Sequence, residues 1–182
     1  MTQAFRWATD IPILETERLH LRAHRVDDFP DSARMWSDPN VTRYIRDTPF
    51  TPEETWSRLL RYIGHWTLLG FGYWAVEEKE TGSFVGEVGF ADYRRNITPP
   101  LDGIPEIGWA LAPQGHGRGF ATEAVLAVTA WGDSHFARKR TACIIAPDNL
   151  ASIRVAVKSG YQEWMRTTYH GNPTVMYVRE AV

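Results

Sequence analysis

One segment, residues 106–123, restricts the fold and the function of this chain more than any other. An apolar run over residues 106–112 leads into three glycines at alternate positions, and a helical apolar pattern begins at Phe120. Glycine adopts backbone angles that other residues avoid and lets a ligand approach the main chain closely. The first N–H groups of a helix have no partner within the helix and lie at its positive end. The segment therefore predicts a strand, an anion-binding turn and a helix, with a pyrophosphate as the natural ligand.

Two familiar phosphate-binding motifs do not fit the spacing of Gly115, Gly117 and Gly119. A nucleoside-triphosphatase loop has lysine and then serine or threonine after its last glycine, whereas Phe120 and Ala121 stand here. A dinucleotide fingerprint, Gly-x-Gly-x-x-Gly, needs a longer interval before its last glycine and an acidic residue after the next strand. A glycine-rich connector without a ligand is the alternative that the motif alone leaves open.

Composition and charge limit the classes of protein to consider. The length of 182 residues fits one domain, residues 1–182, in which residues 1–12 form a loose N-terminal tail. The chain is 43% apolar and 23% charged, as folded globular proteins are, and its net charge of −2 gives no reason to expect a nucleic-acid or membrane partner. Cys143 is the single cysteine and residues 1–12 do not resemble a signal peptide, so we expect a cytoplasmic protein. We expect no metal site among the six histidines.

Alternating and helical apolar patterns predict strands and helices that alternate along the chain. The turn at residues 79–82 joins two strands into a hairpin, and Thr51 followed by Pro52 is a strong helix start. The predicted fold class is α/β (α+β), with a single-domain, mixed, largely antiparallel central sheet of about seven strands flanked by about four helices. The strands are expected at residues 16–23, 72–78, 83–92, 106–112, 141–146, 161–169 and 174–179, and the helices at residues 27–37, from Thr51 onward, 120–134 and 149–159.

Two separate motifs resemble those of the GNAT superfamily of N-acetyltransferases. The stretch from Gln114 to Gly119 fits the Gln/Arg-x-x-Gly-x-Gly/Ala signature of that superfamily. The stretch from Asn149 to Tyr161 resembles its second element, an Asn-x-x-Ser/Ala helix that ends in Gly-Phe/Tyr. Residues 14–22 are similar to one branch, the ribosomal-protein-alanine and related N-terminal acetyltransferases. The resemblance covers nearly the whole chain.

The resemblance implies acetyl-CoA as the cosubstrate and a GNAT-like sheet in which the strand at residues 106–112 splays from the strand at residues 141–146. The pantetheine arm would lie in that gap, and the pyrophosphate would bind N–H groups of residues 114–121. Asn149 would touch the pantetheine or thioester end. The cofactor-binding residues expected on this basis are Trp109, Ala110, Leu111, Gln114, Gly115, His116, Gly117, Arg118, Gly119, Phe120, Ala121, Asn149 and Ser152.

Acetyl transfer to an amine makes three demands on catalytic residues. The ammonium must lose a proton, N–H donors must face the thioester oxygen as it gains charge, and the leaving thiolate benefits from a proton donor. Many superfamily members carry a tyrosine donor where this chain has Ala156, and the branch suggests Ser152 instead. Glu87 and Glu106 are the candidate general bases, and a chain of waters is the alternative. Glu163 is one residue away from the glutamate position of the branch, which on a strand reverses its side.

The sequence leaves more than one class of acceptor amine open. We expect transfer of an acetyl group to a primary amine, on a protein N-terminus or a small molecule, through a tetrahedral intermediate. Trp36, Trp56 and Trp66 lie on the two early helices that help to wall the acceptor groove in this superfamily. A catalytically weak acyl-CoA-binding sensor is the alternative class, and a generic nucleotide-binding domain is the third. An exposed final hairpin would support a homodimer.

Overall fold

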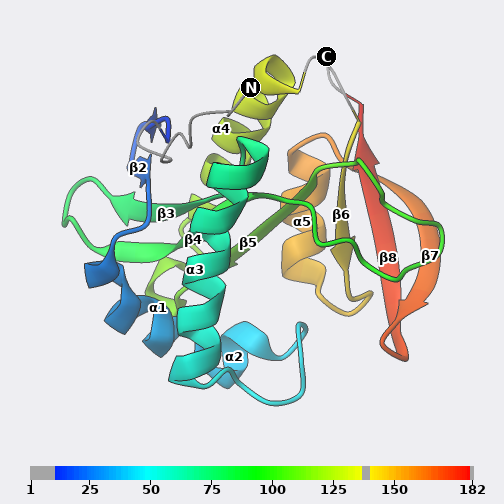
Figure 1. Cartoon of the computed structure of the whole chain (residues 1–182), viewed down its shortest axis with the longest axis horizontal. Helices are drawn as coiled ribbons and strands as arrows, with labels where there is room; N and C mark the ends of the chain where they lie inside the picture. The colour runs from blue at the N-terminus through cyan, green and yellow to red at the C-terminus, as the bar shows by residue number, and fades with distance from the viewer. Residues whose placement is uncertain (1–10, 137–139, 181–182) are drawn as a thin grey trace, which may run out of the picture.

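A mixed sheet of eight strands forms the centre of the computed structural model, which describes residues 11–136 and 140–180. Its strands lie in the order β1-β2-β3-β4-β5-β6-β8-β7, and the β5–β6 pair is parallel whereas the other pairs are antiparallel (Figure 1). This architecture confirms the predicted fold class. The tail expected at residues 1–12 lies outside the described residues except for its last two. The strands are β1 (Leu14–Glu15), β2 (Leu19–Arg22), β3 (Tyr73–Glu78), β4 (Phe84–Ala91), β5 (Glu106–Leu111), β6 (Thr141–Ile145), β7 (Gln162–Tyr169) and β8 (Asn172–Arg179).

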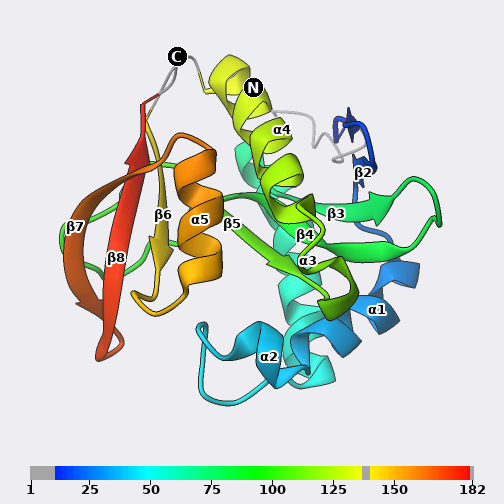
Figure 2. The ribbon, with the colours of Figure 1, turned by 180° about the vertical axis from the view of Figure 1, so that it is seen from behind.

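Helices cover both faces of this sheet. The helices α1, α2 and α3 lie over one face (Figure 1), and α4 and α5 lie over the other (Figure 2). The largest apolar cluster joins α4 to the sheet and includes Phe120, Val128 and Ile107. A smaller cluster joins α1 to the sheet through Trp36 and Ala110. The α-helices are α1 (Phe29–Trp36), α2 (Pro39–Thr42), α3 (Pro52–Leu69), α4 (Phe120–His135) and α5 (Leu150–Lys158), and two 3-10 turns occupy Val26–Asp28 and Pro113–Gly115.

Local capping signals define the ends of α3 and α5, as the sequence predicts. Thr51 and Glu54 form a capping box, in which each side chain binds the backbone N–H of the other residue. Asn149 begins α5, because its side-chain oxygen accepts a hydrogen bond from Ser152 N at 3.1 Å. Gly160 follows α5 with φ of 86°, the left-handed conformation expected of a glycine that ends a helix.

The structure contains two short elements that the sequence did not predict, and the last β-turn lies earlier in the chain than predicted. β1 is an eighth strand, paired with β2 through Leu14 and Glu15. α2 forms directly after α1, because the Asp38 side chain accepts a hydrogen bond from Asn40 N at 2.7 Å and caps a new helix. The final hairpin turns at residues 170–171, so β8 begins two residues earlier than expected.

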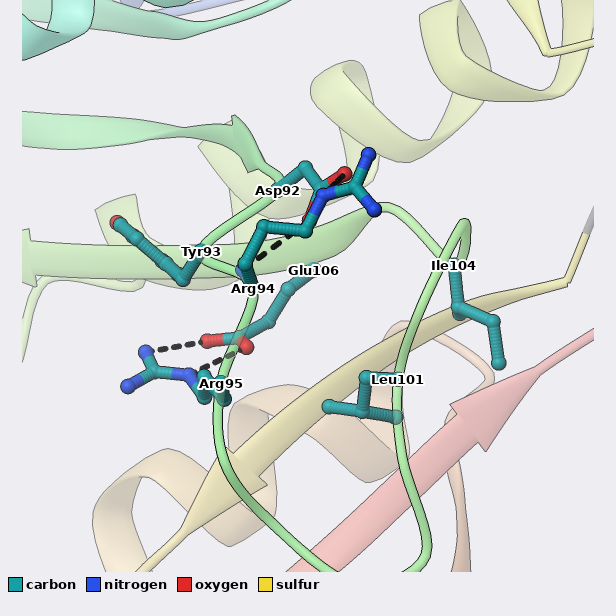
Figure 3. A pocket seen from close by; sticks show the side chains of 7 residues that line it. All are labelled: Asp92, Tyr93, Arg94, Arg95, Leu101, Ile104 and Glu106. Atoms are coloured by element: carbon teal, nitrogen blue, oxygen red, sulfur yellow. Dashed lines mark hydrogen bonds and ion pairs between the residues drawn. The ribbon is translucent and has the colours of Figure 1, made fainter.

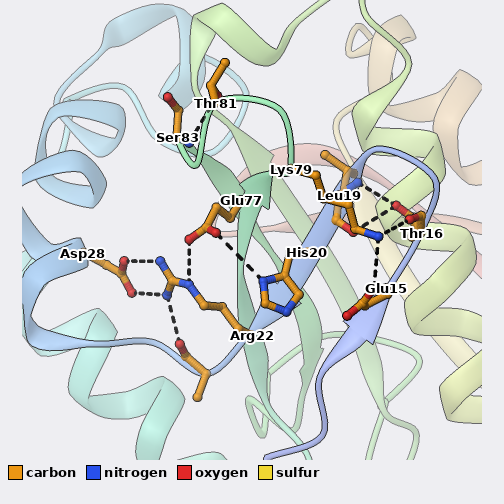
Figure 4. A network of polar contacts seen from close by, with 11 residues as sticks. Glu15, Thr16, Leu19, His20, Arg22, Asp28, Glu77, Lys79, Thr81 and Ser83 are labelled. Atoms are coloured by element: carbon orange, nitrogen blue, oxygen red, sulfur yellow. Dashed lines mark hydrogen bonds and ion pairs between the residues drawn. The ribbon is translucent and has the colours of Figure 1, made fainter.

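A polar network fastens α1 to the outer strands of the sheet (Figure 4). The Arg22 guanidinium donates to both oxygens of Asp28, each at 2.8 Å, and to Glu77 at 2.9 Å. Arg22 is 7% exposed and Asp28 is 5% exposed. Burial works to raise the pKa of Asp28, but the bonds from Arg22 and from the Arg25 N–H together outweigh it, and the pKa is lowered. A buried, fully paired arginine thus fixes the approach of α1 to the sheet.

The strands β5 and β6 touch at one end only. Glu106 and Ala142 form the single pair of their parallel register, and Ala142 N donates to Pro105 O at 3.1 Å. On its other side β5 pairs with β4 along its whole length. Beyond the single pair the two strands diverge (Figure 2). The splay that the resemblance implies is therefore present.

The long loop between β4 and β5, residues 92–105, crosses from these strands to β6 and β8, on the other side of the splay (Figure 1). Its Ile97 and Leu101 pack against Ala142 of β6 and Met176 of β8. The loop consequently ties together the two sets of strands that the splay separates.

Candidate functional site

The edge of β5 that faces β6 carries unpaired backbone groups. In an antiparallel pair, alternate residues direct their N–H and C=O groups toward the partner strand. Ala112 N donates across to β4 at 3.0 Å, so in this register Ala110 also faces β4, and Trp109 and Leu111 face the splay. His116 Nε2 forms a hydrogen bond with the Leu111 carbonyl at 2.8 Å. Of the three residues expected along a pantetheine arm, Trp109 presents both backbone groups, Leu111 presents its N–H, and Ala110 presents neither.

The glycine turn that follows β5 holds a run of backbone N–H groups without acceptors. The N–H groups of Gly115 and His116 bond back to the start of the turn. Those of residues 117–122 donate to no acceptor within residues 11–136 and 140–180. Gly117 and Gly119 adopt the left-handed conformation, with φ of 72° and 81°, which leads the chain into α4. Of the N–H groups expected to bind phosphate, those of Gly115 and His116 are therefore used by the turn itself.

The polar side chains around this turn are engaged with the protein itself. Gln114 Nε2 donates to a β4 carbonyl at 3.3 Å, and Arg118 pairs with Glu78 at the end of β3. Arg18 pairs with Glu123 of α4 at 2.6 Å and donates to the Arg118 carbonyl at 2.9 Å. These contacts brace the turn from outside, and its backbone N–H groups remain for a ligand.

The start of α5 brings Asn149 and Ser152 together. The Asn149 side-chain N–H₂ and the Ser152 hydroxyl form no hydrogen bond with a described residue, and both residues are half-buried. One turn further, Ala156 is fully buried, and the nearby Tyr161 hydroxyl forms a 2.8 Å hydrogen bond with Thr141. The place of the superfamily tyrosine is therefore part of the core, and Ser152 supplies the hydroxyl at the start of this helix.

Glu87, the first candidate base, lies in β4 and faces α1. One carboxylate oxygen accepts a hydrogen bond from Ser32 Oγ at 2.6 Å and the other from Trp36 Nε1 at 2.9 Å. Glu87 is 1% exposed. Its register partner in β5 is Ala110, so the carboxylate lies one strand away from the edge that borders the splay. Its role as a base remains a prediction, which requires an amine or a water to reach it past α1.

Glu106, the second candidate base, is held by Arg95 from the long loop, beside a cavity of about 10 Å³ (Figure 3). Arg95 donates to its two oxygens at 2.6 and 2.7 Å and lies 5.0 Å from the Tyr169 ring centre. Burial works to lower the pKa of Arg95, but the Glu106 carboxylate outweighs it, and the pKa is raised. Glu163 is exposed and pairs with Arg166 at 2.7 Å. Both glutamates have structural partners, and the catalytic role of Glu106 stays a prediction.

A buried polar cluster between α3 and the sheet escaped sequence reasoning. The rings of Tyr62 and Tyr73 stack at 4.3 Å, and a Cβ on Gly108 of β5 would lie 2.1 Å from the Tyr73 hydroxyl. His24 stacks on Tyr62 at 5.3 Å, and neither of its ring nitrogens has a described partner. Arg58 donates to the Tyr62 hydroxyl at 3.2 Å. The available signal was the four-residue interval from Arg58 to Tyr62, which puts an arginine beside the buried stripe of α3.

The described residues contain no group of three or more histidine, cysteine or acidic side chains that could hold a metal ion. His20 and His24 are four residues apart, a spacing that pairs ligands on a helix, but His20 lies on strand β2. In the described parts of the chain, no helix has both the length and the apolar character needed to cross a membrane.

Comparisons with known proteins give matches over most of the chain. Residues 18–162 match the family model of the acetyltransferase (GNAT) domain. The uncharacterized N-acetyltransferase p20 of Bacillus licheniformis is 32% identical over 151 residues, which are 82% of each protein. The crystal structure of an acetyltransferase from Agrobacterium tumefaciens has a TM-score of 0.79 at 27% identity, covering 93% of this chain and 94% of that one. RimL, a ribosomal L7/L12 α-N-protein acetyltransferase solved with coenzyme A, shares the fold with a TM-score of 0.75 at 18% identity, covering 93% and 98%.

Proposed function

The chain belongs to the GNAT family of acetyltransferases, and we propose that it transfers the acetyl group of acetyl-CoA to a primary amine. The observation that carries this proposal is the run of free N–H groups at residues 117–122, directly after a strand with an open backbone edge. Phosphates suit the N–H groups, and the amides of a pantetheine arm suit the open edge. Because β5 and α4 are joined by the turn, one extended ligand can bind both surfaces.

The transfer itself can be assigned to groups of this site. The amine nitrogen attacks the thioester carbon, a C–N bond forms, the C–S bond breaks, the amine loses a proton and the sulfur gains one. The Trp109 N–H, which faces the splay, is our candidate donor to the thioester oxygen. The Ser152 hydroxyl is the candidate donor to the sulfur. Glu87 or Glu106, directly or through water, is the candidate acceptor of the amine proton.

Thermal unfolding with acetyl-CoA, CoA, ATP and NAD at equal concentrations tests the cosubstrate. A ligand that binds only the folded state at a hundredfold excess over its Kd stabilises it by about 2.7 kcal/mol. We expect this stabilisation from acetyl-CoA and CoA and none from NAD. A folded protein that responds to neither CoA species would contradict the proposal.

Turnover separates an enzyme from a sensor. With a panel of primary amines we expect release of free CoA thiol, and we expect Ser152→Ala and Glu87→Gln to slow it while CoA still stabilises the fold. The buried Ala156, in place of a tyrosine, favours one second candidate, an acyl-CoA-binding sensor. Stabilisation by CoA without thiol release from any amine would decide for that candidate. A cytoplasmic location and a homodimer remain predictions from the sequence.

A further inference from the structure

Arg58 is a half-buried cation that lies against two aromatic rings. Its guanidinium carbon lies 3.9 Å from the centre of the Trp36 ring and 4.4 Å from that of the Phe50 ring. One terminal nitrogen donates to the Tyr62 hydroxyl, and the Nε atom is buried without a described partner. Stacking fixes the plane of a guanidinium and leaves the donors at its edge for hydrogen bonding. Arg58 is thus positioned in advance, with donors to spare.

No carboxylate among the described residues pairs with Arg58. Glu87 acts on it electrostatically, but both oxygens of Glu87 are engaged by donors from α1. The nearby Arg46, in contrast, has Glu54 at 2.7 Å. Buried charges are normally paired, because an isolated charge loses its hydration without compensation. A guanidinium with a buried, unpartnered Nε atom therefore indicates an anionic partner outside the described residues.

Arg58 lines a pocket of about 280 Å³ beside the first turns of α3. Glu54 belongs to the same wall but is already held by Arg46. Arg61, one turn after Arg58, adds a second positive charge at the rim, where Glu53 is also exposed. The volume suits a small molecule. The residues that line the pocket are Phe50, Glu53, Glu54, Ser57, Arg58 and Arg61.

The surroundings of Arg58 reach the part of β5 that faces the splay. On one side Arg58 stacks on Trp36, which shares an apolar cluster with Ala110. On the other side it binds Tyr62, whose stacked neighbour in β3 touches Gly108. Trp109 lies between Gly108 and Ala110 on β5, and its backbone N–H and C=O groups face the splay. The pocket thus lies on the face from which an acceptor would approach the open edge of β5.

We propose that Arg58 binds the carboxylate of the acceptor, so that the acceptor is a small amine of the amino-acid class. The inference rests on the proposed function, because it names the substrate of the same site. A guanidinium donates two parallel hydrogen bonds to a carboxylate, and such charge-assisted bonds are stronger than neutral ones. The N-terminal residue of a protein offers an amide at this place and would leave Arg58 unpaired. The pocket therefore favours a free amino acid over a protein N-terminus.

Matched acceptors test the inference in the wild-type protein. The panel consists of the common L-amino acids, β-alanine and 4-aminobutyrate, each beside its carboxamide, with thiol release as the readout. For the preferred acceptor we expect kcat/KM to be about tenfold to a hundredfold higher for the carboxylate than for the carboxamide. Arg58→Gln should bring this ratio close to one, and Arg58→Lys should lower it in part. Arg34→Gln, at an exposed arginine of α1, should leave the ratio unchanged. Stabilisation by CoA shows that each variant is folded.

A binding assay separates the failure of this inference from the failure of the proposed function. The corresponding N-acetyl-amino acids and their carboxamides have no amine left to react, and their affinities are measured with CoA present. A carboxylate preference that Arg58→Gln removes supports the inference even when no amine is acetylated. Efficient acetylation of carboxamides, with equal binding of both series, overturns the inference and leaves the proposed function intact. A preference that survives in Arg58→Gln also overturns it.

Discussion

His24 is enclosed on one side by Tyr62, and the charges that act on it come from Glu87, Asp28 and Arg22. Burial lowers the pKa of His24 below 6.5, and the two carboxylates do not restore it. Below pH 6.5 the unfolded chain protonates this imidazole more readily than the folded protein does. The contribution of His24 to stability is therefore complete above that pH and is lost as the pH falls toward the folded pKa.

Replacing His24 by phenylalanine keeps a ring against Tyr62 and removes the titrating group. Between pH 7 and pH 5 we expect the free energy of unfolding to fall more steeply in the wild type than in His24→Phe. The difference in slope should approach, and not exceed, about 1.4 kcal/mol per pH unit, the value for one proton. Urea denaturation across this range, with each protein compared to itself at pH 8, measures it. Parallel curves would show that His24 binds protons equally in the folded and unfolded states, and would contradict the lowered pKa.

Single residues also show where sequence reasoning stops. The arginine at position 58 belongs to no motif, and its partial burial depends on rings supplied by α1 and by Phe50. Glu87 could be selected from its apolar neighbours in the sequence, but its two partners on α1 could not. Contacts between distant segments determine whether a charged side chain is exposed, paired or buried. The spacing of apolar residues in the sequence does not predict these contacts.

At the scale of elements, the turn between β5 and α4 depends on glycine conformation. Gly117 has φ of 72°, and a Cβ there would meet nothing within 4 Å. Gly171, in the β7–β8 turn, has φ of 80° and equally open surroundings. The two positions therefore make a matched pair, one inside the candidate phosphate site and the other remote from it.

We expect Gly117→Ala and Gly171→Ala to lose about 1–2 kcal/mol of stability each, because a side chain disfavours the left-handed region. Only Gly117→Ala should also lose affinity for CoA, by about tenfold, as its N–H groups turn away from the phosphates. Thermal unfolding and calorimetric titration measure the two effects. Equal CoA affinity in both variants would place the phosphates elsewhere.

Elements were predictable where the signal is local. The Thr51-Pro52 start, the Asn149 cap and the Gly160 stop each rest on hydrogen bonds or backbone angles within one turn of chain. β1 and α2 were missed because elements of two and four residues are too short to show a period. The range of free N–H groups in the glycine turn also needed the structure, since two N–H groups of the motif are used by the turn itself.

At the scale of the whole molecule, the sheet consists of two sets of strands joined at a narrow seam. One β5–β6 pair and the loop over residues 92–105 connect them, and the bidentate Arg95–Glu106 pair holds that loop to β5. The splay was expected from the family resemblance, whereas the bridging role of the loop was not. Loop residues such as Ile97 and Leu101 have no periodic pattern, so only the structure shows what they cover.

Arg95→Met removes the partner of a carboxylate that is 6% exposed. We expect it to cost about 3 kcal/mol of stability, because Glu106 is left buried and unpaired. The control is Arg140→Met, which breaks an exposed pair with Glu180 and should cost about 1 kcal/mol or less. Chemical denaturation compares the two variants. Equal losses would mean that the seam pair contributes no more than a surface ion pair.

The narrow seam also has a mechanical consequence. Force applied across the sheet, between β3 and β7, has to pass through one strand pair, the long loop and the helix contacts behind it. The strand pairs on either side run over several residues and resist such a load together. Rupture would therefore begin between β5 and β6. A molecule that binds the open edge of β5 and the start of α5 at the same time would work as a clasp across the weakest line of the sheet.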